Sequence, residues 1–396
     1  MASAPDLMTG RIVSRGAGPF RPTVVAFAAA GMVAFAELYG VQALLPAIAR
    51  EFDISAGSAA LAQSAGALGV AVAVLPWSFA ARRVGRGTLI RIAVISTIML
   101  SPVVVFAGSL EVLLVVRFLQ GAVLAGIPAL AVPHLGDLLA RAPAVIAAGW
   151  YISGTAIGGL TGRLVAGVVG AVADWRTALI AVSLVVAAAA ILFLAAAPRV
   201  AGRPAIASGL RSGLDRRGIG ALCGLALVQM GAFVALYNFL GFRLIAPPLS
   251  FPEMMVTGIF VLYVVGSIAA ARSGRAAARW GKARVMGCAL VVQSAGAALT
   301  AADGASAIVV GTAIVTASFF TVHALAAGWV AELANGSAVP TGLYTIAYYA
   351  GAAVLGWCFG LVLDVGGWSA LAATIVAASA ASLLLVRVAS TGVRGR

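Results

Sequence analysis

The sequence is a series of long apolar stretches separated by short charged segments. A helix needs about 20 apolar residues to cross the hydrocarbon core of a membrane. Of the 396 residues 62% are hydrophobic and only 10% are charged, whereas a soluble domain carries roughly 25% charged residues. The sequence therefore predicts an all-α membrane protein with twelve transmembrane helices, at residues 23–45, 58–80, 88–108, 110–133, 144–171, 177–197, 219–243, 253–271, 284–302, 305–330, 340–363 and 368–387.

The basic residues indicate how these helices are oriented. If the N-terminus is cytoplasmic, 21 of the 26 basic residues fall in cytoplasmic tails and loops, and only Arg50, Arg176 and Arg243 fall outside. Cytoplasmic loops are enriched in arginine and lysine. We therefore expect a multi-pass membrane protein with both termini cytoplasmic. Its net charge of +14 reflects this topology, so the lipid bilayer is an expected partner and nucleic acid is not.

The two halves of the sequence resemble each other. The pattern Ala-Phe-x-x-Leu-Tyr occurs at 34–39 and again at 232–237, and the loop Arg-Val-Gly-Arg at 83–86 is matched by Arg-Trp-Gly-Lys at 279–282. Parallel repeats of this kind place a substrate site between the halves near the middle of the membrane. The predicted organisation is a cytoplasmic tail at 1–22, six-helix pseudo-repeats at 23–197 and 219–387, a cytoplasmic linker at 198–218 and a tail at 388–396.

Several other function classes lack their sequence signals. The cysteines Cys223, Cys288 and Cys358 are isolated, and the chain has only two histidines, so neither a CxxC pair nor an HExxH metal motif is present. No P-loop motif occurs. We therefore expect neither an enzyme nor a metal or other cofactor, and a proton gradient is the expected energy source.

Two motifs resemble those of the major facilitator superfamily. Arg117, Gln120 and Gly121 match the helix-four motif of that family, an arginine followed by Gln-Gly and small residues. The helix-five antiporter motif GPxxGG reads GTAIGG here, with its glycines at Gly154, Gly158 and Gly159 and a threonine in place of the proline. Together with the stretches ELYGVQALLP, GGLTGR and FFTVH, the sequence looks like the bacterial arabinose-efflux-permease-like drug/proton antiporters. This resemblance implies the major facilitator fold and a hinge role for the glycines, although helix packing alone would also explain them.

The loop after the second predicted helix also resembles the superfamily, whose pattern there is GxxxDRxGRR. This chain has Arg82, Arg83, Gly85 and Arg86 in that loop, so the aspartate of the family is replaced by arginine, and its counterpart in the second half is Ala278. The resemblance implies a loop that controls conformational change, with a latch that differs from that of the family. Charges that only fix the membrane topology are the alternative.

Glu37 is the only acidic residue well inside a predicted span. A carboxylate at membrane depth costs roughly 2.5–3.5 kcal/mol on insertion scales and is usually retained for a task. At about 1.5 Å per residue, Glu37, Arg117 and Arg163 are expected at similar depth in one half. We therefore expect Glu37 to exchange protons with the two arginines as charge partners, and the resemblance adds that exporters often pair a helix-one acid with the helix-four arginine. A static ion-pair cluster is the alternative.

A second set of polar residues is expected at the cavity. His323 lies deep in the tenth predicted helix, where it would relay protons or form a neutral structural hydrogen bond. The polar-tipped residues expected to face the substrate are Tyr39, Gln42, Tyr151, Tyr237, Asn238, Tyr344, Tyr348 and Tyr349. A pocket rich in tyrosine and poor in amides suits an amphipathic solute, and tyrosines that only pack helices are the alternative.

These expectations combine into one functional prediction. The sequence predicts a monomeric secondary active transporter that exports a small amphipathic or drug-like compound in exchange for protons by alternating access. A facilitator or proton symporter for a sugar or organic anion is the alternative, because two buried arginines could bind an anion. A non-transporting receptor or a membrane enzyme is a remote third possibility.

Overall fold

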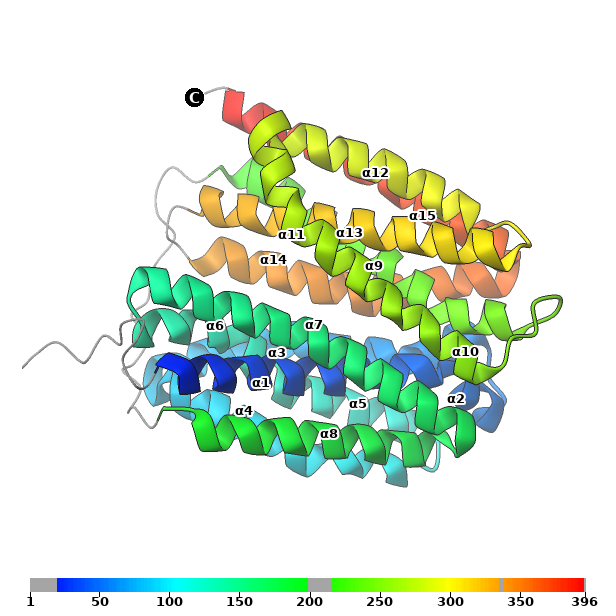
Figure 1. Ribbon diagram of the computed structural model, residues 1–396, viewed down its shortest axis with the longest axis horizontal. Coiled ribbons are helices and arrows are strands. Elements are labelled where there is room, and N and C mark those ends of the chain that lie inside the picture. The colour runs from blue at the N-terminus through cyan, green and yellow to red at the C-terminus, as the bar shows by residue number, and fades with distance from the viewer. Residues whose placement is uncertain (1–19, 199–214, 335–337, 395–396) are drawn as a thin grey trace, which may run out of the picture.

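The structure, a computed structural model, describes residues 20–198, 215–334 and 338–394. In these residues the secondary structure is helical and no β-strand occurs (Figure 1). Most of the predicted N-terminal tail (1–22) and most of the predicted linker (198–218) lie outside the described residues. The residues of the predicted C-terminal tail (388–396) are helical as far as Arg394.

The helices fall into two sets, one on either side of residues 199–214. The N-terminal half contains α1 (Phe20–Tyr39), α2 (Leu45–Phe52), α3 (Ala56–Val84), α4 (Arg86–Leu100), α5 (Leu110–Leu124), α6 (Gly126–Leu138), α7 (Arg141–Val172) and α8 (Trp175–Ala196). The C-terminal half contains α9 (Arg216–Ile245), α10 (Glu253–Thr257), α11 (Tyr263–Trp280), α12 (Lys282–Leu299), α13 (Ala305–Leu333), α14 (Ala338–Ala350) and α15 (Gly356–Arg394). Short irregular turns join some of them: η1 (Gly40–Leu44), η2 (Ser101–Phe106), η3 (Gly258–Leu262) and the π-helical η4 (Gly351–Leu355).

Ten helical stretches in the described part of the chain are long and apolar enough to cross a membrane. The longest, Val339–Thr391, is one stretch by continuity but bends at Gly367, whose φ of 66° is not helical. The tenth stretch therefore covers the last two predicted spans. The ten do not include α12, which covers the ninth predicted span. These two differences account for the gap between ten and the predicted twelve.

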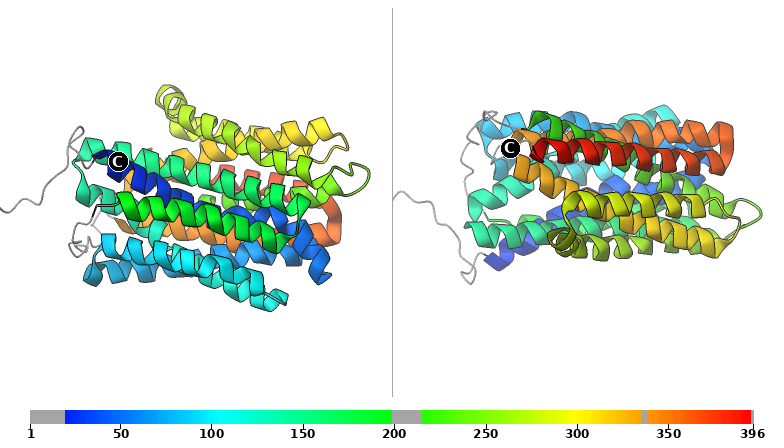
Figure 2. Two further views of the ribbon diagram at one scale, coloured as in Figure 1. Left: turned by 60° about the horizontal axis from the view of Figure 1, so that its bottom comes forward. Right: turned by 90° about the horizontal axis from the view of Figure 1, so that it is seen from above.

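The long helices run side by side along the bundle, so the bundle has two ends (Figures 1 and 2). We call the end where α8 stops and α9 starts the linker end, and the opposite end, where α2 lies, the Arg50 end. Helix α1 begins and α15 ends at the linker end (Figure 1). The first and the last described residues, Phe20 and Arg394, therefore lie on the same side of the bundle.

Two glycines with a left-handed backbone join helices at the linker end. Gly85 separates α3 from α4 with a φ of 88°, and Gly281 separates α11 from α12 with a φ of 85°. Residues with a Cβ atom rarely adopt such angles. The two loops that the sequence pairs with each other therefore turn in the same way.

Glycines also allow α7 to lie against α1. A Cβ atom at Gly154 would lie 2.0 Å from the Ala28 carbonyl oxygen, and one at Gly158 would lie 2.5 Å from Met32 Cα. Only glycine permits backbones to approach this closely. Two glycines of the antiporter-like motif thus build the contact between the first and fifth predicted spans. A Cβ atom at the third, Gly159, would instead lie 3.1 Å from Arg163 Nη1.

Candidate functional site

The Glu37 carboxylate is buried inside the N-terminal half. Its side chain is 4% exposed and is the only buried acidic side chain among the described residues. Ser101 Oγ donates a hydrogen bond of 2.5 Å to Glu37 Oε2 and lies 2.8 Å from Ser183 Oγ. Because Ser101 belongs to η2 and Ser183 to α8, the carboxylate points into its own half and away from the C-terminal half.

Arg117 lies beside this carboxylate but is held mainly by backbone carbonyls. Its Nη1 is 3.9 Å from Glu37 Oε1, which makes a long ion pair. The guanidinium donates to the carbonyl oxygens of Glu37, Leu38 and Ala62 at 3.2, 2.8 and 3.3 Å. The Glu37 carboxylate is therefore more distant than these carbonyl oxygens, and Arg117 joins α5 to both α1 and α3.

The other two residues of the helix-four motif support the same arrangement. Gln120 accepts from Arg117 Nη1 at 2.8 Å and donates to the carbonyl oxygens of Leu100 and Ser101 at 3.2 and 3.1 Å. A Cβ atom at Gly121 would lie 2.0 Å from the Gly66 carbonyl oxygen. Both residues therefore fix α5 against its neighbours around the Glu37 site.

Arg163 does not join Glu37 and Arg117, contrary to the expected grouping of three charges. It lies on α7 and its side chain is 2% exposed. Its Nε donates a hydrogen bond of 2.7 Å to Gln42 Oε1, and its Nη1 donates one of 2.8 Å to the Gly159 carbonyl oxygen. Its guanidinium carbon lies 4.4 Å from the ring centroids of both Tyr39 and Tyr263. Among the described residues no carboxylate pairs with it. The two arginines therefore occupy different sites, and only Arg163 lies between the halves.

Gln42 connects this arginine to the C-terminal half. Its Nε2 donates a hydrogen bond of 2.7 Å to Asn238 Oδ1 on α9. Gln42, Asn238 and Tyr39, three residues predicted to face the cavity, are therefore brought together around Arg163.

His323 and most of the predicted tyrosines form a separate group in the C-terminal half. Rings there contact one another in a continuous aromatic cluster: Phe233, Tyr237, Phe260, Tyr263, Phe319, Phe320, His323, Tyr344, Tyr348 and Tyr349. His323 Nδ1 is 2.9 Å from Tyr344 Oη. His323 thus has a local partner in its own half, and none of its contacts involves Glu37.

The cluster reaches Arg163 and the N-terminal half at four points, one of which is the Phe260 ring, 5.6 Å from the guanidinium carbon. Tyr263 contacts the guanidinium directly, the phenols of Tyr348 and Tyr39 interact, and Tyr151 on α7 lies near Tyr349. Sequence reasoning missed Tyr263, Phe260, Phe233 and the Phe319–Phe320 pair. An aromatic residue within an apolar span carries no signal of the direction in which it points.

The charged loop at the linker end makes its contacts within one half. Arg86 Nη1 lies 2.5 Å from Asp137 Oδ2, and Lys282 forms the corresponding ion pair with Glu332 in the C-terminal half. Arg82 lies over the Phe79 ring at 5.0 Å, and the Arg83 side chain is exposed. Between residues that the structure describes, no ion pair joins the two halves at this end.

At the Arg50 end the two halves are joined directly. Arg50 Nη2 lies 2.5 Å from Glu253 Oε1, and Asp364 accepts from Ser55 Oγ at 2.7 Å and from the Gly57 amide at 3.2 Å. A Cβ atom at Gly167 would lie 2.3 Å from Thr257 Oγ1, so α7 and α10 touch. These contacts close the space between the halves at this end.

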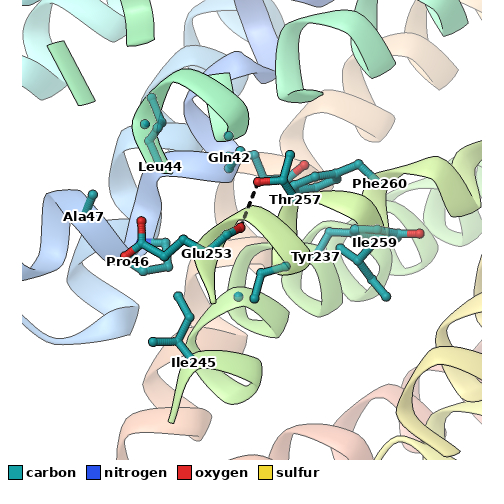
Figure 3. Close-up of a pocket in the computed structure, with 15 residues that line it drawn as sticks. Gln42, Leu44, Pro46, Ala47, Tyr237, Ile245, Glu253, Thr257, Ile259 and Phe260 are labelled. Atoms are coloured by element: carbon teal, nitrogen blue, oxygen red, sulfur yellow. Dashed lines mark hydrogen bonds between the residues drawn. The ribbon is translucent and has the colours of Figure 1, made fainter. Parts of the chain in front are cut away.

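A small cavity lies just inside this closure (Figure 3). Gln42 and Pro46 line it from one half and Tyr237, Glu253 and Thr257 from the other, and Thr257 Oγ1 donates to the Glu253 carbonyl oxygen at 3.0 Å. Its volume is about 20 Å³, enough for roughly one water molecule. The space between the halves is therefore almost filled here.

No group of three or more potential metal ligands occurs among the described residues. The functional groups that the fold assembles are therefore the Glu37 site within one half and the Arg163 site between the halves. Both lie in helices long and apolar enough to cross a membrane.

The sequence of this chain is similar to those of known membrane transporters. The chain is 30% identical over 357 residues to the uncharacterized MFS-type transporter YybF of Bacillus subtilis, covering 88% of each chain. It is 27% identical over 385 residues to the inner membrane transport protein YnfM of Escherichia coli, covering 95% of this chain and 92% of YnfM.

Solved structures agree with this fold at lower sequence identity. A bacterial homologue of the human lysosomal transporter Spinster, in an inward-facing and occupied conformation, superposes with a TM-score of 0.74 at 15% identity, covering 96% of this chain and 98% of that one. The nucleoside transporter NupG superposes with a TM-score of 0.67 at 12% identity, covering 93% and 99%. Residues 26–270 match the family model described as Major Facilitator Superfamily. The chain therefore belongs to the major facilitator superfamily of membrane transporters.

Proposed function

We propose that this transporter exports a small amphipathic compound in exchange for protons by alternating access. The observation that carries the proposal is the Glu37 site, a single buried carboxylate held by Ser101 and adjacent to Arg117. Acidic residues at membrane depth mark proton or ion pathways in transporters. Protonation of Glu37 would remove the charge that faces Arg117 and the Ser101 hydroxyl, so these contacts would change with each proton bound or released.

Helix α1 supplies a physical connection between the two sites. It carries Glu37 toward the interior of the N-terminal half and, two residues later, Tyr39 against Arg163 between the halves. The helix then tightens into the 3₁₀ turn η1, which holds Gln42. Such turns within a helical segment often mark a hinge. A change at Glu37 would therefore be transmitted along one turn of helix to the contacts that join the halves.

The proposal includes the complete membrane topology. We propose twelve spans in two six-helix pseudo-repeats, with both termini on the cytoplasmic side of the bacterial inner membrane. Matched features support the repeat: Arg86–Asp137 corresponds to Lys282–Glu332, and Gly154 on Ala28 corresponds to Gly351 on Leu227. The arginine-rich linker end would be cytoplasmic. A structure that is closed at the Arg50 end would then be closed toward the outside.

Transport into everted membrane vesicles tests this function. The probes are 2-naphthoate, 2-naphthamide and 2-naphthylmethylamine, which share one aromatic body and differ in charge. We expect an imposed proton gradient to drive uptake of at least one of them, and Glu37→Gln to abolish that drive. The matched control is Glu111→Gln, since Glu111 is an exposed carboxylate at the start of α5. Gradient-driven uptake that is the same in Glu37→Gln and wild type would refute the role of Glu37.

A second candidate function is favoured by Arg163. A buried cation between the halves, with no carboxylate partner among the residues that the structure describes, also suits a facilitator or proton symporter for an organic anion. The same vesicles separate the two functions. An antiporter accumulates its substrate when the vesicle interior is acidic, a symporter does so when the exterior is acidic, and a facilitator responds to neither gradient.

A further inference from the structure

The Arg163 guanidinium is a buried positive charge without a negative partner in the described part of the chain. It is 2% exposed, and its hydrogen bonds go to two neutral oxygens, Gln42 Oε1 and the Gly159 carbonyl. Burying a charge is costly unless it is paired. Arg117, the other buried arginine in a span, has both a carboxylate neighbour and three carbonyl partners. Among the described residues Arg163 is thus the buried cation whose charge the protein leaves uncompensated.

The guanidinium also retains free hydrogen-bonding capacity. Arginine has five N–H donors in a planar fork. Nε and Nη1 are used, while Nη2 has no acceptor among the described residues. The rings of Tyr39 and Tyr263 contact the guanidinium at 4.4 Å each. Ring contacts occupy its faces, so the groups left to bind a further partner are in-plane N–H bonds, which suit a carboxylate.

The surroundings of this charge suit an aromatic body. Tyr263, which contacts the guanidinium, also contacts Phe233 at 5.5 Å and Phe320 at 5.8 Å between ring centroids, at interplanar angles of 67° and 89°. These rings belong to the aromatic cluster and extend from Arg163 into the C-terminal half. A flat apolar group attached to an anion would find stacking and edge contacts directly beside the charge.

We propose that Arg163 and the aromatic cluster form the substrate site, and that the substrate is an aromatic organic anion whose carboxylate binds Arg163. This inference rests on the proposed function, since it assumes that a solute is carried between the halves, and it specifies the class of that solute. Tyr39 and Tyr263 come from opposite halves, so the carboxylate is bound where the halves meet.

Binding of the anion would also act on a contact between the halves. A carboxylate that binds the Nε and Nη2 edge of the guanidinium displaces Gln42 Oε1 from Nε, and the same Gln42 side chain donates a hydrogen bond to Asn238 Oδ1. Asn238 Nδ2 is buried and has no hydrogen-bond partner within the described ranges. It can therefore donate a hydrogen bond to the displaced Gln42 oxygen. Occupation of Arg163 therefore rearranges the Gln42–Asn238 link between the halves.

The test is equilibrium binding to the full-length protein in nanodiscs, without any proton gradient. We expect wild type to bind 2-naphthoate at least tenfold more tightly than 2-naphthamide, its neutral counterpart, or 2-naphthylmethylamine, its cationic counterpart. Removing one partner of a buried charge pair weakens binding by about 30-fold or more. Arg163→Gln should lose this much affinity for 2-naphthoate and keep its affinity for 2-naphthamide. Arg387→Gln, a change of an exposed arginine on α15, should behave as wild type.

Three results would overturn the proposal: no binding of 2-naphthoate to wild type, equal binding of the three probes, or an unchanged preference for the anion in Arg163→Gln. The comparison of probes on wild type needs no variant, so it decides the matter even if Arg163→Gln does not fold. If wild type prefers the anion but shows no gradient-driven uptake, only the proton-exchange function is refuted. If it shows gradient-driven uptake but no preference for the anion, only the substrate class is refuted.

Discussion

Asp364 offers the most direct test of how the two halves are held together. Its carboxylate accepts from Ser55 Oγ at 2.7 Å and from the Gly57 amide at 3.2 Å, and both donors belong to the opposite half. Asp364→Ala removes both hydrogen bonds and leaves the neighbouring Arg50–Glu253 pair intact. We expect this variant to open the Arg50 end more often than wild type.

The size of the effect follows from these two contacts. A hydrogen bond to a charged group contributes about 1.5–3 kcal/mol, but Asp364 and Ser55 are exposed to solvent, which reduces the contribution. A total of about 1–3 kcal/mol remains, and this corresponds to a shift of about 5–150-fold in the ratio of open to closed protein.

Distances between pairs of spin labels measure this ratio. Gly108 and Gly304 lie at the Arg50 end in different halves, and Gly136 and Gly274 lie at the linker end. A Cβ atom at any of the four would have no atom within 4 Å, so each accepts a labelled cysteine after Cys223, Cys288 and Cys358 are replaced by serine. In Asp364→Ala the population with a long Gly108–Gly304 distance should rise, and the Gly136–Gly274 distance should shorten in the same molecules.

A variant of matched chemistry serves as the control. Glu51 accepts from Trp175 Nε1 and Arg176 Nη1, both at 2.5 Å, and these partners lie in the same half and at the same end. Glu51→Ala therefore loses two comparable contacts without touching the join between the halves. If Asp364→Ala leaves both distance distributions unchanged, or if Glu51→Ala changes them equally, the contacts at Asp364 do not hold the Arg50 end closed.

Two further predictions concern stability, measured as thermal unfolding of the purified protein. Gly158→Val should destabilise the fold by about 1–3 kcal/mol, because the valine side chain would meet the α1 backbone at Met32. Gly149 lies on the same helix and has open space around it, so Gly149→Val should be neutral. Equal effects of the two changes would contradict the packing argument. Arg117→Gln should lower the free energy of unfolding by about 3–5 kcal/mol, because it leaves buried carbonyl oxygens and the Glu37 carboxylate without their partner. An unfolding temperature equal to that of Arg387→Gln would contradict the central role of Arg117.

Much of the fold was predictable because hydrophobic length alone identifies membrane helices. The family that the motifs indicate is confirmed by the match over residues 26–270, and the proximity of Glu37 and Arg117 was predictable from depth along two helices. Antiport and the proton-coupling roles stay predictions. The ten apolar stretches differ in number from the twelve predicted spans partly because the last stretch is continuous through Gly367, where a single residue has a non-helical φ.

The position of Arg163 could not be predicted from the sequence. Depth places it level with Glu37, but the direction of a side chain around the helix axis decides which half it faces. In α7 the glycines Gly154 and Gly158 turn toward α1, while Gly159 and Arg163 share a different face. An apolar span surrounded by lipid and protein on all sides has no polar face from which this rotation could be read.

The small size of the cavity behind the Arg50 end bears on whether protons can leak through the protein. A proton crosses a protein quickly only along an unbroken file of waters or exchangeable groups, and a space of about 20 Å³ admits roughly a single water. In this conformation the described residues leave no continuous file of waters at the Arg50 end, so under the proposed exchange a proton could not cross there on its own, without the substrate.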